Sequence, residues 1–430
     1  MGYKQIYYYF FLLFSLVVNL SDLKGQEFKF IDSVYVSNIK SVKFHMAGNP
    51  LTLAAIPLAS EFPLVLSFDD MDTDSKDYSV SIIHCNKNWT PSEQINELEY
   101  LPGYNDAPIR DISLSFNTLV PYVHYFIALP NSEVGWKISG NYLLKVVDRD
   151  NDDNVVITKR FIIYEPIMKI VPSVTRTVEI SKSTTHQELD FEVQHPGVIV
   201  RSPRTEMSAT IIMNYRWDNA ITDVNPVFIK PESAVFDHQD KIVFEAGKEF
   251  RFFDMRGLNI LGENVNYIRR VPEGFEVTLR KESVNSNATY LFRKDINGSF
   301  VIDCYDVDVI ECDTKGDYAY VFFSLDSPDE FQGKSVYITG AITDWQLKPD
   351  FKMQYNHSKG VYEAEILLKQ GYYNYQFTVV DQVTKKRDDN LLQGNWFETE
   401  NSFSIIVYYR GFSDRYDRPV AFGVFDSRKY

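Results

Sequence analysis

The segment YSVSIIHC, residues 78–85, carries the pattern that decides how this chain folds. In an extended strand the even-numbered residues from Tyr78 to His84 would lie on one face, and the odd-numbered residues from Ser79 to Cys85 would lie on the other. Successive side chains of a strand point to opposite faces, so the alternation predicts a β-strand with His84 and Cys85 turned apart. A Cys–His catalytic pair needs hydrogen-bonding distance between its members, and we do not expect these neighbours to form one.

The same alternation recurs along the chain, in YLLKVVD (142–148) and VVITKRFII (155–163). Turn-forming residues separate such runs, as in DRDNDDN (148–154). Helical periodicity is rare, and QINELEYL (94–101) predicts only a turn or two of helix, which Pro102 ends. Strands at short spacing without helices between them predict an all-β protein built from tandem β-sandwiches.

Composition limits the classes of function. The 430 residues are 44% hydrophobic and 15% aromatic, enough for several domains that each bury a core. The formal net charge of −15 argues against nucleic-acid binding, which requires basic patches that neutralise phosphates. The same charge gives no reason to expect adsorption to an anionic membrane surface.

The N-terminus resembles a targeting segment. Lys4 precedes the apolar run IYYYFFLLFSLVVNL (6–20), which is short for a membrane span. A signal peptide over residues 1–25, cleaved near Gly25–Gln26, fits this pattern. No cysteine lies near the cleavage point, so we expect an exported, unlipidated mature chain, and no later segment is apolar enough to span a bilayer.

Breaks in the strand pattern divide the mature chain. A first sandwich is expected over 26–165, where Pro166 interrupts the pattern, and a second over 166–312. A third is expected over 313–410, with a less regular C-terminal tail at 411–430. The resulting prediction is three sandwich domains in tandem.

Three cysteines follow the signal peptide. Cys304 and Cys312 are close in sequence and are predicted to form a disulfide in an oxidising compartment, if strands flanking a tight hairpin bring them together. Cys85 is left over and is expected to pack in a core as a small hydrophobic side chain.

No catalytic, cofactor-binding or metal-binding motif was found. The seven histidines form no HExxH pair, and no CxxC occurs. The acidic runs 69–77 and 148–154 begin like calcium loops, but the second has Asp153 and Lys159 where a calcium loop requires glycine and glutamate. We interpret both runs as solvated turns.

The third segment resembles the immunoglobulin-like (E-set) modules of starch- and glycogen-binding proteins. The resemblance is carried by VYITGAITDWQ (336–346) and by the strand around GYYNYQF (371–377). The matching residues are Gly340, Trp345, Leu368, Gly371, Tyr373, Tyr375 and Phe377. Gln376 occupies the usual place of a sugar-binding lysine, so we expect the fold to be retained and the glycan site to be lost.

Motifs spread over nearly the whole mature chain resemble the plug proteins of the type IX secretion system, a family formerly known as a domain of unknown function. The motifs include HCNKNWTPS (84–92) with EYLPGY (99–104), FEAGKEFRFFDMRGL (244–258), DINGSFVI (295–302) and GNWFETENSFSIIVYYRGFSDRYDRP (394–419). The pair Cys304 and Cys312 is not part of this resemblance.

The resemblance implies a non-enzymatic periplasmic protein. Such a plug would bind the periplasmic opening of the large outer-membrane translocon barrel, and so associate peripherally with the outer membrane, and would seal the barrel when no cargo is exported. Two alternatives stay open: an exported glycan-binding protein of a polysaccharide-uptake system, and an exported hydrolase with an unrecognised site.

Aromatic and arginine side chains are favoured at the centres of protein interfaces. The first candidates for contact with the translocon are Trp89, Tyr100 and Tyr104. Alternatively, these aromatic side chains hold residues 86–104 against their own sandwich. Arg415, Tyr416 and Arg418 in the tail are the second group of candidates.

Overall fold

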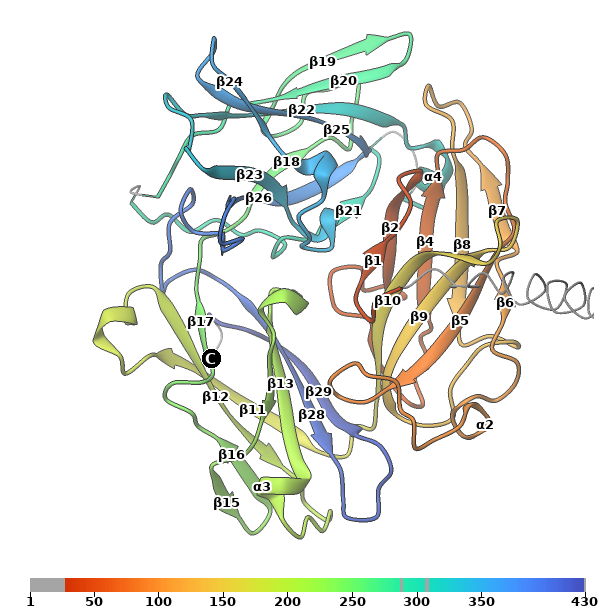
Figure 1. The fold of residues 1–430 in the computed structure, drawn as a ribbon, viewed down its shortest axis with the longest axis vertical. Helices are drawn as coiled ribbons and strands as arrows, with labels where there is room; N and C mark the ends of the chain where they lie inside the picture. Colours follow the sequence, from red (N-terminus) through yellow and green to blue (C-terminus); the bar gives the residue numbers. More distant parts are fainter. Residues whose placement is uncertain (1–27, 287–288, 306–308, 429–430) are drawn as a thin grey trace, which may run out of the picture.

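The computed structural model describes residues 28–286, 289–305 and 309–428. The signal peptide expected over residues 1–25 lies outside the described residues. The described chain is built almost entirely of strands, which form six sheets stacked in pairs as three β-sandwiches (Figure 1). The predicted fold class is therefore confirmed.

The first sandwich forms from one continuous segment. Its two sheets pack around a core that includes Tyr78, Tyr125 and Tyr142, all buried. The first sheet has the order β1 (Ser33–Val34), β10 (Asn154–Tyr164), β9 (Gly140–Asp148), β5 (Tyr78–Cys85) and β6 (Ala107–Pro108), with β3 (Ala55–Pro57) on β10. The second has the order β2 (Ile39–Met46), β4 (Leu64–Asp70), β8 (Val123–Leu129) and β7 (Asp111–Leu114).

The second sandwich takes its strands from two distant parts of the chain. One sheet has the order β11 (Lys169–Arg176), β12 (His186–Gln194), β16 (Ser233–Phe236) and β15 (Phe228–Lys230), with β17 (Val243–Glu245) on β12. The other has the order β14 (Ile221–Val224), β13 (Met207–Met213), β28 (Ser402–Tyr409) and β29 (Arg418–Asp426). Phe191, Phe236 and Phe403 lie in the core between these sheets.

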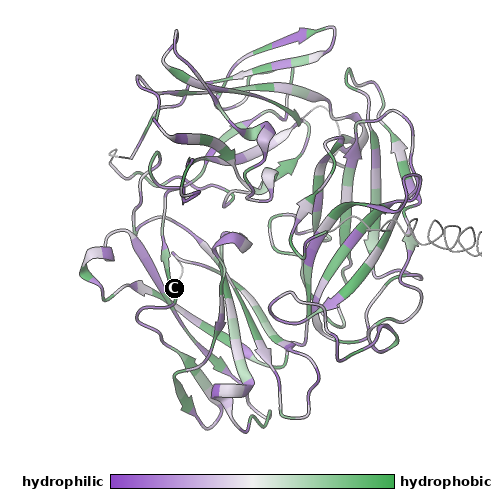
Figure 2. Ribbon diagram, viewed as in Figure 1, coloured by the Kyte–Doolittle hydropathy of each residue, from purple (hydrophilic) through white to green (hydrophobic). Residues whose placement is uncertain are grey.

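The third sandwich lies between the two halves of the second in sequence. One sheet contains β26 (Gly371–Asp381), which pairs with β18 (Arg251–Asp254), β21 (Phe300–Ile302), β23 (Lys334–Thr339) and β27 (Arg387–Asp388). The other has the order β19 (Val265–Val271), β20 (Gly274–Leu279), β22 (Tyr318–Asp326), β25 (Val361–Lys369) and β24 (Gln354–Asn356). Hydrophobic residues line the strands of all three sandwiches (Figure 2).

The sheets therefore divide the chain differently from the linear division expected at 312 and 410. β18 to β21 precede residue 312 but pair within the third sandwich, because their partners are β26 and β22. Part of the expected tail forms β29, which pairs with β28 along most of its length. Sheet partners that are far apart in sequence leave no local signal for such an arrangement.

Helices are few and short among the described residues. The α-helices are α2 (Glu97–Tyr100), α3 (Pro203–Glu206) and α4 (Val309–Lys315). The 3-10 turns are η1 (Ile180–Lys182), η2 (Trp217–Asn219), η3 (Ala341–Thr343) and η4 (Pro349–Phe351). The turn of helix predicted within 94–101 is confirmed by α2, whose first turn is held by a capping box between Asn96 and Glu99.

Buried polar contacts join the first and third sandwiches. The Lys369 ammonium lies 2.7 Å from the Asp69 carboxylate, which also accepts a hydrogen bond from the Tyr318 hydroxyl at 2.7 Å. The His124 ring lies 2.6 Å from the same carboxylate. Burial opposes ionisation of Asp69, but Lys369 and His124 together hold the pKa of this carboxyl below its ordinary value.

The second sandwich is held to the third by an arginine. Arg216 binds the carboxylates of Asp218 and Asp389, each at 2.7 Å, and its guanidinium lies 4.3 Å from the centre of the Trp345 ring. Arg387 of the third sandwich reaches Asp218 at 3.0 Å. The three sandwiches therefore contact one another through specific side chains and not only through linkers.

Candidate partner-binding surface

Residues 86–104 form an ordered excursion from the first sandwich. It leaves β5 at Cys85, passes through α2 and returns at β6. Tyr100 is buried, with its ring centre 5.5 Å from that of His84 and 6.0 Å from that of Tyr142. Tyr100 therefore fixes the excursion to the core of its own sandwich.

His84 and Cys85 have structural roles. The Nδ1 atom of His84 lies 2.8 Å from the Ser92 hydroxyl, and burial lowers the pKa of His84 to about 4. Cys85 is fully buried, which raises the pKa of its thiol to about 12. A protonated, buried thiol is not a nucleophile, and the two side chains have separate partners. The prediction that Cys85 packs in a core is confirmed.

Trp89 lies at the junction between the first and second sandwiches. Its ring meets that of Trp217 edge to face, with centres 5.0 Å apart. The guanidinium of Arg160 lies over both rings, 5.5 Å from the centre of Trp89 and 4.6 Å from that of Trp217. Trp89 thus links two sandwiches of the same chain.

The loop between β28 and β29 meets the excursion. Arg415 forms an ion pair with Glu99 of α2. The Tyr416 ring centre lies 5.2 Å from that of His84, and Arg418 binds Glu165 at 2.6 Å. The structure therefore brings the two groups of candidate residues together, and we call residues 86–104 and 410–418 the joined loops.

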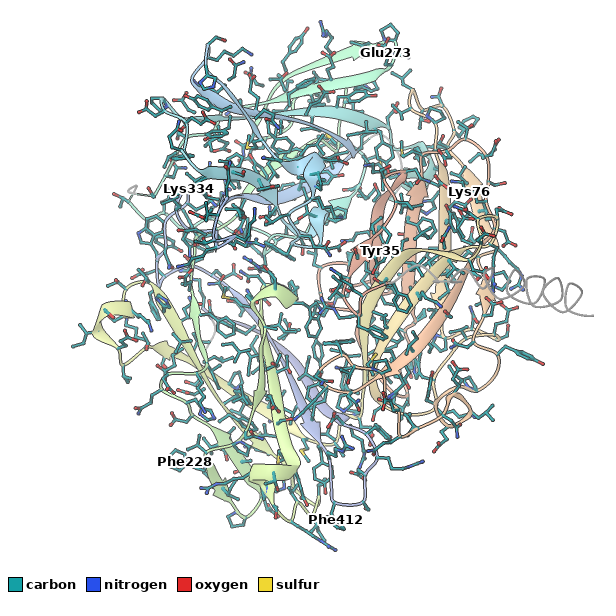
Figure 3. All side chains as sticks on the ribbon, viewed as in Figure 1. Tyr35, Lys76, Phe228, Glu273, Lys334 and Phe412 are labelled. Carbon is teal, nitrogen blue, oxygen red and sulfur yellow. A yellow bond between two sulfur atoms is a disulfide. The ribbon has the colours of Figure 1, made fainter. Side chains whose placement is uncertain are left out.

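The joined loops also present large apolar side chains to solvent. Tyr104 is 88% exposed and Leu98 is 81% exposed. Phe412 is fully exposed at the tip of the β28–β29 loop (Figure 3). Leu98 and Phe412 were not identified from the sequence, because isolated apolar residues in a loop do not reveal whether a core covers them.

The surface expected for glycan binding is occupied by other parts of the chain. Trp345 is only 7% exposed, because Arg216 and Phe250 cover its ring. A Cβ added to Gly298, which has a φ of +76°, would collide with the same ring. Gln376, at the expected lysine position, is buried as well. Trp345 therefore acts as a packing residue between sandwiches and not as an open platform for a sugar ring.

Cys304 and Cys312 are joined by a disulfide, with their Cα atoms 5.6 Å apart. Cys304 follows β21 and Cys312 lies on α4, so the bridge ties a strand end to a helix and not to a second strand of a hairpin.

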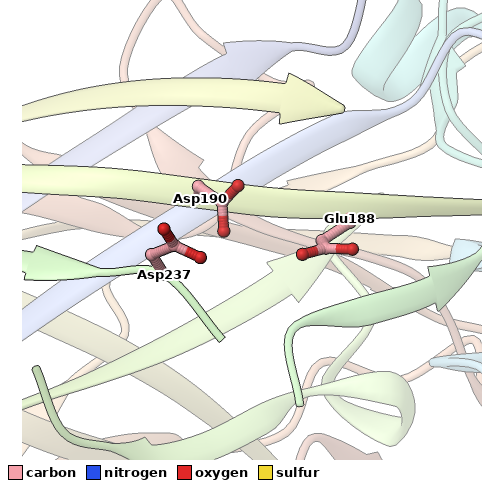
Figure 4. A group of neighbouring side chains, drawn as sticks. All are labelled: Glu188, Asp190 and Asp237. Atoms are coloured by element: carbon pink, nitrogen blue, oxygen red, sulfur yellow. The ribbon is translucent and has the colours of Figure 1, made fainter. Parts of the chain in front are cut away.

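Three carboxylates gather on the outer face of the second sandwich: Glu188 and Asp190 from β12, and Asp237 directly after β16 (Figure 4). Burial, followed by the charges of Asp237 and Glu188, raises the pKa of Asp190 to about 6. The sequence analysis predicted no metal site and did not single out these residues. The available signal was the alternation of acidic residues in HQELDFEVQ (186–194), which places them on one face of a strand.

These features define a tandem β-sandwich protein that exposes apolar side chains on ordered loops. Among the described residues, no helix has the length and apolar character needed to cross a membrane. Residues 39–165 match the model of the type 9 secretion system plug protein first domain. Residues 330–405 match the model described as the glycogen recognition site of AMP-activated protein kinase.

The chain is also similar to a solved structure, the crystal structure of a hypothetical protein from Parabacteroides merdae ATCC 43184. The identity is 30%, the TM-score is 0.87, and the match covers 93% of this chain and 100% of the other. A search of curated proteins found no match. The chain belongs to the type 9 secretion system plug protein family, and its role is related to that system.

Proposed function

We propose that this protein is a plug of the type IX secretion system, which binds the periplasmic opening of the outer-membrane translocon barrel and seals it when no cargo is exported. The observation that carries the proposal is the match of residues 39–165 to the plug family model. The protein acts by binding and not by catalysis, and it resides in the periplasm, where it associates with the outer membrane through the translocon.

The packing of the sandwiches suits this role. A pore wide enough for folded cargo leaks unless a body of fixed shape closes it, and packed β-sandwiches resist deformation. Lys369 with Asp69, and Arg216 with Asp389, lock the third sandwich to its two neighbours. The plug would therefore enter and leave the barrel as one unit.

The joined loops supply the contact with the barrel. Closure requires an interface of at least standard size, roughly 1,200–2,000 Å² in total, with aromatic side chains near its centre. Tyr100, Trp89 and Arg418 hold the loops in place, whereas Tyr104 and Phe412 remain exposed for a partner. Because the loops are already ordered, little conformational entropy is lost when they bind.

Affinity purification tests the proposed partner. The tagged chain is expected to retain the translocon barrel from detergent-solubilised outer membranes, and the double variant Tyr104→Ala/Phe412→Ala is expected to retain at least tenfold less. Tyr267→Ala is the matched control, since Tyr267 is 54% exposed on β19 of the third sandwich. Failure of the wild-type chain to retain any translocon would refute the assignment.

Loss of the gene tests the sealing function. A deletion strain is expected to become sensitive to large hydrophilic antibiotics such as vancomycin while cargo secretion continues. A strain that keeps its permeability barrier with the translocon normally expressed contradicts the proposal. N-terminal mass spectrometry of the periplasmic fraction, which is expected to find a chain that begins near Gln26, tests the proposed location.

A further inference from the structure

The acidic cluster on the second sandwich combines two separate elements. Glu188 and Asp190 lie two residues apart on β12 and face outward, whereas Leu189 between them enters the core. Asp237 begins the loop that connects β16 to β17. One carboxylate oxygen from each of the three residues lies within 4.8 Å of the others. In Figure 4 the three carboxyl groups face a common space.

Two oxygens of the cluster lack partners. Glu188 is only 3% exposed, and its Oε2 atom has no hydrogen-bond donor among the described residues. The Oδ1 atom of Asp190 is buried and likewise lacks a donor within the described chain. A carboxylate oxygen removed from water without a partner is strongly unfavourable, and either protonation or a cation placed beside it relieves that cost.

The neighbouring strands do not supply that charge. Glu188 lies opposite Thr175 on β11 and Val243 on β17. Asp190 lies opposite Ser173. None of these cross-strand neighbours carries a basic side chain, although lysine or arginine at such positions is the usual way to neutralise an acidic strand face.

We propose that Glu188, Asp190 and Asp237 bind a hard divalent cation, and that this cation is Ca²⁺. Calcium takes six to eight oxygen ligands at about 2.3–2.6 Å, so two oxygens on one ion lie up to about 5 Å apart. The three ligand oxygens all lie within 4.8 Å of one another, which is compatible with that limit. Magnesium demands a near-ideal octahedral geometry and keeps several of its waters, so three carboxylates drawn from a strand and a loop suit the more flexible coordination of calcium.

The ion would bridge β12 and the β16–β17 loop. β16 pairs with residues 191–194 of β12, and β17 pairs with residues 186–188. The ion would lie where the loop between β16 and β17 passes beside β12. The binding of Ca²⁺ would therefore hold this edge of the sheet together. Asp237 is less buried than Glu188, so water can complete the coordination from its side.

Calorimetry and thermal unfolding of the full chain, freed of metal with EDTA, test the site. We expect CaCl₂ to bind with a Kd of about 10⁻⁴–10⁻³ M, as in extracellular calcium modules. At tenfold above that Kd, the Tm is expected to rise by roughly 3–6 °C. The same concentration of MgCl₂ is expected to produce a much smaller rise.

Variants separate the site from general charge effects. Glu188→Gln is expected to abolish the calcium-dependent rise in Tm. If Glu188→Gln does not fold, Asp237→Asn replaces it as the test variant, because Asp237 lies in the loop, and is expected to abolish the same rise. Glu192→Gln is the matched control, because Glu192 lies on the same face of β12 but is paired with Lys230 at 2.9 Å. An equal response to magnesium, an unchanged response in Glu188→Gln, or no calcium binding by the wild-type chain at 10 mM CaCl₂ would each overturn the proposal.

Discussion

The buried contact between Lys369 and Asp69 allows a quantitative test of how the first and third sandwiches are joined. Lys369 is 1% exposed and donates to the Asp69 carboxylate at 2.7 Å and to the Asp313 carbonyl at 2.6 Å. In Lys369→Met the side chain keeps most of its volume but loses its charge. The Asp69 carboxylate then remains buried with only Tyr318 and His124 beside it.

Removal of one partner from a buried ion pair costs about 3–5 kcal/mol. Because Tyr318 and His124 remain, we expect Lys369→Met to lower the free energy of unfolding by about 3 kcal/mol at pH 7. Urea unfolding followed by tryptophan fluorescence measures the change. Lys359→Met is the control, since Lys359 is exposed and is paired with Glu363; we expect it to change stability by less than about 0.5 kcal/mol.

The pH dependence of the difference tests the electrostatic cause. In the wild-type chain the pKa of Asp69 is lower in the folded state, so its contribution is complete above the unfolded value of about 3.9 and is lost as pH falls through the folded value. In Lys369→Met burial is no longer balanced by the ammonium, and the folded pKa of Asp69 is expected to rise. As pH falls, protonation of Asp69 then removes the cost of burying its charged carboxylate in the variant.

The difference in stability between wild type and Lys369→Met is therefore expected to shrink between pH 7 and pH 4.5. A difference that stays constant over this range, or one at pH 7 no larger than that of Lys359→Met, would refute the reasoning.

Three further changes test other contacts. Replacement of Cys304 and Cys312 by serine is expected to lower stability by about 2–3 kcal/mol, measured by urea unfolding, and free thiols that alkylate fully in the unreduced wild-type protein would contradict the bridge. Gly140→Ala places a Cβ against the buried ring of His84, so we expect a loss of about 1–3 kcal/mol, and an unchanged Tm would show that the ring can move aside. Arg216→Met leaves Asp389 with Arg387 as its remaining cation and is expected to cost about 2–3 kcal/mol; the stability of Asp389→Asn/Arg216→Met should be closer to wild type.

The sequence predicted the features that depend on neighbouring residues. Alternation in residues 78–85 and 155–163 predicted strands β5 and β10, and the short helix before Pro102 was predicted from its local pattern. The division into sandwiches was not predictable in the same way. β28 pairs with β13 from Met207↔Tyr409 to Met213↔Phe403, and no residue in either strand indicates a partner so far along the chain.

The candidate surface shows the same limit. Its residue types favoured Trp89 and Arg415 as interface anchors, but exposure depends on what the fold places over a side chain. Arg160 lies over Trp89 and Tyr100 is buried, whereas Arg415 stays exposed beside its partner Glu99. The acidic pair on β12 could be read from its spacing, whereas Asp237 joins it only through the pairing of β12 with β16.

The position of the third sandwich between the two halves of the second has a consequence for the timing of folding. A chain emerges from the ribosome N-terminus first, at about 5–20 residues per second. β13 ends at Met213 and β28 begins at Ser402, so roughly 10–40 seconds separate their synthesis at that rate. During this interval the sheet that faces β12 lacks β28 and β29, so part of the apolar face around β12 is uncovered, whereas the first sandwich is already complete. The half-built second sandwich is thus the stage at which a chaperone, or a protease, would find this chain most accessible.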